Sequence, residues 1–334
     1  MTGALALAGC SVIDDNLDDC GTDYQLDYEL RLVTNLTTEL QTALTAQTDV
    51  SVASALRTHL ADIFTDHAHD VDLSFYDTQG DSLRLQHDQH IMDANQASYT
   101  LFLPMRQYMH LAVANVIDNP LVSIANDERC HTTELHQIPA DTIDSHTTGL
   151  FTARLPMEVL EGVNQQFNVH LYMANCAAAL VVDTVGSGIS DMWVYTTGFA
   201  SGFDIADSVF TYADTPPVVR AEAVSTEPTG QQVFCSVNFP SRDVRSTRTI
   251  IETTDPFIAP SADESLWQYI VCVELPDGSI TRTSLFLNTP LRAGQFHVLK
   301  ARAHTDGAVR TADPTVGVSV TTNWNHGGQY NPEL

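Results

Sequence analysis

The sequence predicts an all-β protein of two β-sandwich domains, with a short helical insertion in the first domain. Stretches in which apolar and polar residues alternate recur along most of the chain, and this period of two is typical of half-buried strands. A helical spacing of apolar residues occurs only within residues 36–63. The 334 residues are enough for two cores, and the hydrophobic content of 43% is that of an ordinary globular protein.

The first sandwich is expected over residues 25–157. Residues 25–34 alternate between apolar and charged side chains and predict a strand. Leucines then recur every fourth position over residues 36–44, and a similar stripe follows Ser51, which we expect to cap a second short helix. Further strands are predicted over residues 71–77, 99–103 and 111–116.

The second sandwich is expected over residues 158–334, because the polar, weakly periodic residues 130–148 are typical of a domain junction. Residues 169–182 are apolar on both faces and indicate one long central strand. A Pro-Asp-Gly-Ser turn at 276–279 predicts a hairpin. The other strands are predicted over residues 192–197, 218–224, 233–239, 267–275, 281–287, 296–303 and 316–324.

The charge excludes some classes of partner. Asp and Glu total 42 against 15 Lys and Arg, which gives a formal net charge of -27. Nucleic acids and anionic membrane surfaces would repel such a chain. We therefore expect no nucleic-acid partner, and the charge fits either a soluble extracytoplasmic protein or a salt-adapted host.

The motifs of common enzymes are missing from the sequence. It contains no phosphate-binding loop and no G-x-S-x-G nucleophile elbow. His67 and His69, flanked by acids, form the most metal-like segment, but no third ligand is evident and a solvated connector explains them equally well. The histidines of residues 87–90 lie in what reads as an acidic, polar loop. We expect no catalysis, no metal and no cofactor.

The N-terminal residues resemble a secretory signal that ends at a lipidated cysteine. Leu7-Ala8-Gly9-Cys10 is similar to a bacterial lipobox, in which the thiol is acylated and the preceding peptide bond is cut. Residues 1–9 would be the remnant of the signal peptide, and residues 10–24 a tether. The alternative is a free or buried cysteine near the N-terminus.

Five other cysteines are widely spaced, which argues against a zinc site or a disulfide-built scaffold. Their pairing stays open. Cys235 alternates with apolar residues and is expected to be buried on a strand. The five are Cys20, Cys130, Cys176, Cys235 and Cys272.

Several short sequence segments, taken in order, resemble the FimB-type fimbrial anchor lipoproteins of the Bacteroidales. The resemblance covers nearly the whole chain after the signal. It implies two transthyretin-like β-sandwich domains, an outer-membrane lipid anchor at Cys10, and a role in attaching a fimbria and limiting its length. The segments that carry the resemblance are residues 10–20, the strand at Leu26, and residues 70–77, 99–104, 108–115 and 316–328.

The resemblance also implies partners and a location. The partners would be fimbrial pilin subunits and the outer-membrane bilayer, and no catalytic residues carry over from the family. Acids shortly after the lipidated cysteine, Asp14 and Asp15, are similar to a signal for export to the cell surface. We expect a lipid-anchored protein exposed on the outer membrane.

A strand edge would supply the contact with the next pilin, because its unpaired N–H and C=O groups can accept a strand from another subunit. Val316, Val318, Val320 and Trp324 alternate with small or polar residues, so the last strand is the candidate donor or edge. The alternative is that this strand only completes its own sheet.

Two other functions stay open. The chain could be a minor or tip fimbrial subunit that acts as an adhesin. It could also be a glycan-binding surface lipoprotein, with Trp193, Trp267 and Trp324 as a stacking platform. Core packing is favoured for Trp267 and Trp324, because both alternate with apolar neighbours.

Overall fold

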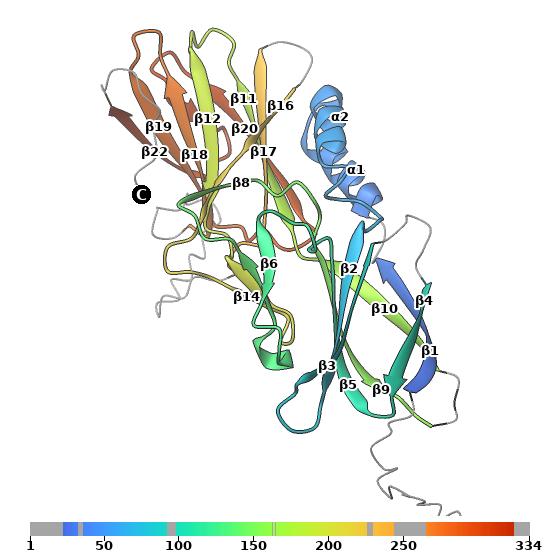
Figure 1. The fold of residues 1–334 in the computed structure, drawn as a ribbon. Helices are drawn as coiled ribbons and strands as arrows, with labels where there is room; N and C mark the ends of the chain where they lie inside the picture. Colours follow the sequence, from blue (N-terminus) through green and yellow to red (C-terminus); the bar gives the residue numbers. More distant parts are fainter. Residues whose placement is uncertain are drawn as a thin grey trace, which may run out of the picture.

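The computed structural model confirms the all-β class, with 52% of the described residues in strands and 9% in helices. Figure 1 shows the strands in two groups, with a pair of helices beside the group that contains the C-terminal strands. The transthyretin-like character of the two sandwiches stays a prediction. The residues that the structure describes are 23–32, 36–91, 98–161, 163, 165–225, 230–243 and 265–323.

Seven strands from the first part of the chain form one curled sheet. β10 (Gln166–Met173) connects its two sides, since it pairs in parallel with β1 (Asp23–Leu32) and at its C-terminal end also pairs with β9 (Phe151–Glu158). Leu26 and Leu73, from opposite sides of the sheet, lie in the same buried core. In spatial order the strands are β3 (Arg84–Ile91), β2 (Asp70–Asp77), β5 (Gln107–Ala114), β9, β10, β1 and β4 (Ser98–Pro104).

The second group is a sandwich of a five-stranded and a six-stranded sheet. Their facing side chains, such as Leu180 and Tyr269, form a second core. The five-stranded sheet has the order β16 (Glu222–Val224), β17 (Gln231–Asn238), β11 (Cys176–Asp183), β20 (Phe296–Ala303) and β21 (Val309–Arg310). The six-stranded sheet has the order β22 (Gly317–Asn323), β19 (Ile280–Leu287), β18 (Trp267–Glu274), β12 (Asp191–Thr197), β15 (Val218–Arg220) and β8 (Thr142–Asp144).

The central strand β11 is buried on both faces, as expected for an apolar run of this kind. Ala178 and Leu180 face the interior of the sandwich, whereas Ala177, Ala179 and Val181 face the other core, which contains the helices. The strand therefore needs a cover on each side.

The helical pair supplies the second cover. α1 (Leu36–Gln47) and α2 (Val50–His59) follow β1 in sequence, yet they pack on the outer face of the five-stranded sheet (Figure 1). The Gln47 amide joins α1 to β20: its Oε1 accepts the Val298 N–H at 2.9 Å and its Nε2 donates to the Phe296 carbonyl at 3.4 Å. The insertion that was expected to belong to the first sandwich therefore covers the second.

Several expected boundaries are wrong. The apolar residues 169–182 form two strands, because the chain passes from one sheet to the other at Ala174-Asn175. Ser51 lies inside α2, and the N-cap is Asp49, without a side-chain capping bond. Residues 87–90 belong to the edge strand β3 rather than to a loop.

The polar stretch expected to be a junction contains short strands instead. β7 (Glu134–Gln137) lies in a four-stranded sheet, and β8 pairs in parallel with β15 of the second sandwich. The expected domain division at residues 157/158 stays a prediction, although the change of sheet comes later, after β10. The four-stranded sheet has the order β14 (Val209–Thr211), β13 (Gly202–Asp204), β7 and β6 (Val122–Ala125), and a 3₁₀ turn, Cys130–Thr132, precedes β7.

A buried polar network holds the chain where it changes sheets. The Asn175 Oδ1 accepts the Leu150 N–H at 2.6 Å, so its Nδ2 is left to donate to His146 Nδ1, at 2.8 Å. A neutral imidazole has one acceptor and one donor nitrogen. We therefore assign the proton to His146 Nε2, which lies 3.2 Å from the side-chain amide of Gln137. A protonated Nε2 needs an acceptor, so this amide must present its oxygen to the imidazole, which also gives the buried Gln137 Oε1 its partner.

The helical cover should depend on Gln47. Gln47→Ala leaves the half-buried Val298 N–H without its acceptor and should lower the free energy of unfolding by about 1–2 kcal/mol. Gln41→Ala, on an exposed part of the same helix, should change it by less than about 0.5 kcal/mol. Urea unfolding of the two variants measures the difference. Equal effects would contradict the proposed link.

Acid should weaken the fold. Burial lowers the pKa of His110 and of His146 to about 4, so the unfolded chain, with ordinary histidines, binds more protons below about pH 6.5. The stabilisation from these two neutral imidazoles is complete above that pH and is lost as the pH falls toward 4.

Urea unfolding at about pH 7.5 and about pH 5 should therefore differ by roughly 2 kcal/mol for each imidazole. The exposed-site variant His67→Gln should keep the same pH dependence. A free energy of unfolding that stays level across this range would show that the two imidazoles are not held neutral.

Candidate functional site

The candidate interaction edge is β22, the last strand of the described chain. It pairs antiparallel with β19, from Gly317 opposite Phe286 to Asn323 opposite Ile280, and it ends the six-stranded sheet. Within the described residues no strand pairs with its other side. β22 therefore completes its own sheet, and its other edge is unpaired as far as the described residues go.

The apolar side chains at this edge divide into two kinds. Val316 is only 6% exposed and packs in the core of the second sandwich, whereas Val318 and Val320 are 42% and 41% exposed. Trp324, the fourth expected member of the row, lies outside the described residues. The edge thus presents two valines to solvent beside unpaired backbone groups.

β22 has neither the charged residues of edge strand β3 nor the proline of edge strand β4. Charged side chains and prolines are common means of preventing strand addition at a sheet edge. β3 carries Arg84 and Asp88, and β4 ends at Pro104, while no residue of β22 is charged or a proline. β4 is also uncharged and is the closest match to β22 in length and composition.

The cysteines of the described part are poor candidates for reactive sites. Cys130, Cys176, Cys235 and Cys272 are buried free thiols, and the burial of Cys235 confirms the expectation for that strand. Burial raises the pKa of each of them, to about 11 for Cys272, so they stay protonated at neutral pH. Cys10 and Cys20 lie outside the described residues.

The histidine-rich segments have structural roles. His67 and His69 are exposed, and no cluster of three metal-ligating side chains occurs in the described ranges. His87 Nε2 lies 2.6 Å from Asp72 Oδ2 on the neighbouring strand. Gln89 Nε2 donates to the same oxygen at 2.8 Å. These contacts connect β3 to β2.

The tryptophan platform is not supported by the position of Trp267. Its side chain is buried, with 1% exposed, and its Nε1 donates to the Thr289 carbonyl at 2.9 Å. It contacts Tyr269 edge-on, with ring centroids 5.1 Å apart. Trp193 is half-buried against another cluster. Trp267 is a core residue, as its apolar neighbours indicated.

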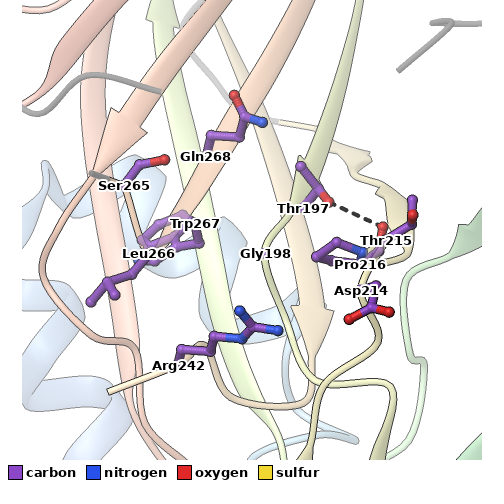
Figure 2. Close-up of a pocket in the computed structure, with 10 residues that line it drawn as sticks. All are labelled: Thr197, Gly198, Asp214, Thr215, Pro216, Arg242, Ser265, Leu266, Trp267 and Gln268. Atoms are coloured by element: carbon purple, nitrogen blue, oxygen red, sulfur yellow. Dashed lines mark hydrogen bonds between the residues drawn. The ribbon is translucent and has the colours of Figure 1, made fainter. Parts of the chain in front are cut away.

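A pocket of about 280 Å³ lies where β12 ends and β18 begins. Figure 2 shows the Arg242 guanidinium directed into it, with Asp214 and Leu266 on opposite sides. This pocket could not be predicted from the sequence, because its charged residues come from separate loops and match no motif. Neither of the two helices in the described residues is long and apolar enough to cross a bilayer.

Solved structures share this fold, while no curated protein matches the sequence. A Bacteroides ovatus protein provisionally assigned as an adhesin aligns with a TM-score of 0.50 and 13% identity, over 84% of this chain and 87% of its own. A Bacteroides thetaiotaomicron protein, provisionally assigned to polysaccharide binding, aligns with a TM-score of 0.52 and 9% identity, over 88% and 97%. The fimbrial anchor protein Mfa2 from Porphyromonas gingivalis aligns with a TM-score of 0.48 and 11% identity, over 90% and 97%. At these identities the two Bacteroides structures show the fold alone, and the Mfa2 alignment, with a TM-score below 0.5, carries no argument.

The sequence itself identifies the family. Residues 34–255, more than half of the chain, match the family of fimbrillin-A associated anchor proteins Mfa1 and Mfa2. The match begins just before α1 and extends beyond β17. It confirms the resemblance to fimbrial anchor proteins. The chain belongs to the fimbrillin-A associated anchor protein family.

Proposed function

We propose that this protein is a non-enzymatic anchor that attaches a fimbria to the outer membrane, facing the cell surface, and limits its length. A lipid on Cys10 would hold it in the membrane, and the next pilin would bind by adding a strand to β22. The observation that carries the proposal is the long, uncharged, open edge of β22 with its two exposed valines.

Strand addition fits the physical properties of this edge. A strand laid beside β22 would satisfy its outward backbone N–H and C=O groups, and each such hydrogen bond stabilises by about 1 kcal/mol net. Val318 and Val320 would lose contact with water when apolar side chains of the added strand cover them. Backbone pairing would supply affinity, and the valines would set the register.

The anchor would act at the other end of the chain. A single acyl chain binds a bilayer only marginally, whereas two or more hold firmly, at about 0.8 kcal/mol per buried methylene. Twelve residues lie between Cys10 and Asp23, the start of β1, and the thirteen Cα–Cα steps from one to the other reach at most about 45 Å. The first sheet would therefore stay near the membrane.

Length control would follow from the same two contacts. A pilin bound to β22 has its strand-pairing surface occupied by a subunit that cannot leave the membrane. Further subunits then cannot enter at that end of the filament, so each anchor fixes one base. Without the anchor, growth would continue and the filament would detach.

Removal of the thiol tests the membrane contact. Cys10→Ala in the native host should move both the protein and its fimbriae from the membrane fraction to the medium, because no acyl chain could be attached. Immunoblots of the two fractions measure the shift, and mass spectrometry of the wild-type protein should show acyl chains on Cys10. A variant that stays in the membrane with fimbriae attached would contradict lipid anchoring.

Charges placed on β22 test the pilin contact. Val318→Lys with Val320→Lys puts two cations where an added strand must pack, and should release most of the fimbriae into the medium while the protein stays in the membrane. The matched control places two lysines at exposed positions of β4, Thr100→Lys with Phe102→Lys.

Electron microscopy of cells and medium, together with the melting temperature of each purified variant, separates lost binding from lost folding. If only the β4 variant released its fimbriae, the pilin would bind at the edge of β4 instead of at β22. Retention of fimbriae by the β22 variant would rule out strand addition at β22.

A further inference from the structure

The pocket between β12 and β18 is built by a close approach of two backbones. Gly198, at the end of β12, has φ +100°, and a Cβ there would lie 2.6 Å from the Leu266 carbonyl oxygen. A residue with a side chain could not take this conformation without displacing the start of β18. The walls of the pocket are therefore fixed by the framework of the second sandwich.

Two charged groups face this pocket from different loops. Arg242 lies over the Tyr212 ring at 5.1 Å and makes one long hydrogen bond, from Nη2 to the Ala213 carbonyl at 3.4 Å. No other acceptor for its N–H groups occurs among the described residues. Asp214 forms no hydrogen bond or ion pair with any other residue of the described chain, and Figure 2 shows it apart from Arg242.

Neutral and apolar groups complete the lining. The Gln268 amide and the Thr215 hydroxyl also lack partners within the described part of the chain, and both border the pocket. Leu266 and Pro216 supply apolar surface on its two sides (Figure 2). Small-molecule sites combine apolar walls with a few polar groups in this way.

We propose that this pocket binds one neutral sugar residue. A hydroxyl group both donates and accepts hydrogen bonds, so a ring of hydroxyls can donate to Asp214 and accept from Arg242 without carrying a charge. The C–H face of the ring would lie against Leu266 or Pro216. A volume of about 280 Å³ is near the lower end of the roughly 300–1,000 Å³ of small-molecule sites, which suits a single ring.

The charges of the pocket disfavour other small ligands. The two charged residues cancel, and the chain as a whole carries -27, so a simple anion gains little there. A free amino acid could pair with both charges, but ion pairs open to water contribute only about 0–1 kcal/mol. The hydroxyl groups of a sugar can also form hydrogen bonds with Gln268 and Thr215, and a free amino acid would not form these bonds.

Saturation-transfer NMR on the whole protein tests the proposal, with glucose, galactose, mannose, fucose and N-acetylglucosamine as probes. At least one sugar should receive saturation. Asp214→Asn and Arg242→Gln should each weaken its binding roughly 10-fold or more, because each removes hydrogen bonds to a charged group.

Two neighbouring variants serve as controls. Asp243→Asn and Arg292→Gln remove the same charges from an exposed ion pair outside the pocket, 3.0 Å between Arg292 Nε and Asp243 Oδ1, and should bind within about 2-fold of wild type. The proposal is overturned if no sugar binds, if free alanine binds and the sugars do not, or if the pocket variants bind as the controls do. It does not depend on the anchoring role, because fimbriae are absent from this experiment.

Discussion

The burial of β11 on both faces is the constraint on which the rest of the fold depends. A strand of the composition Cys-Ala-Ala-Ala-Leu-Val-Val is stable only when both sides are kept from water. The six-stranded sheet covers one side. The other side is covered by α1 and α2, which the chain makes soon after β1, long before it makes β11. Segments far apart in sequence must therefore meet before either part of the molecule is complete.

This shared cover joins the two groups of strands mechanically. The core beneath the helices continues from Leu73 of the first sheet to Val181 and Val237 of the second sandwich, without a break. Separating the two groups would expose that core at about 25 cal/mol for each Å² of apolar surface. A protein pulled at β22 by a filament, and held at its N-terminal end, would pass the load through this core rather than through a linker.

Elements that a local pattern of apolar residues determines could be predicted from the sequence. Elements that depend on contacts between distant segments could not. The alternation around β1, β2 and β19 marks strands, and the leucine spacing marks the helices. Strand β3 was not predicted because it is an edge with polar residues on both faces, and the three-residue strands β13 and β14 are too short to show a period. The single strand predicted over residues 218–224 is divided into β15 and β16, which lie in different sheets. The break at Asn175 could not be predicted because Ala174 is apolar, and only the hydrogen bonds of Asn175 to Leu150 and His146 explain it.

The candidate sites differ in the same way. The row of valines in β22 could be predicted from the sequence. The pocket could not, because Asp214, Arg242 and Gln268 meet only in the folded chain.

If a pilin strand adds to β22, the charge of the rest of the protein would make that uncharged edge more specific. With 42 acidic and 15 basic residues, two copies of this chain repel each other over most approaches. That repulsion falls off within about 8–10 Å in physiological salt, so it acts mainly between charged surfaces in near contact. β22 has no charge of its own, and a strand arriving there would meet backbone groups and Val318 rather than carboxylates. A strand edge without charged residues or prolines normally promotes aggregation. Here the surrounding negative charge would restrain random self-association, while a strand presented in the correct register could still pair.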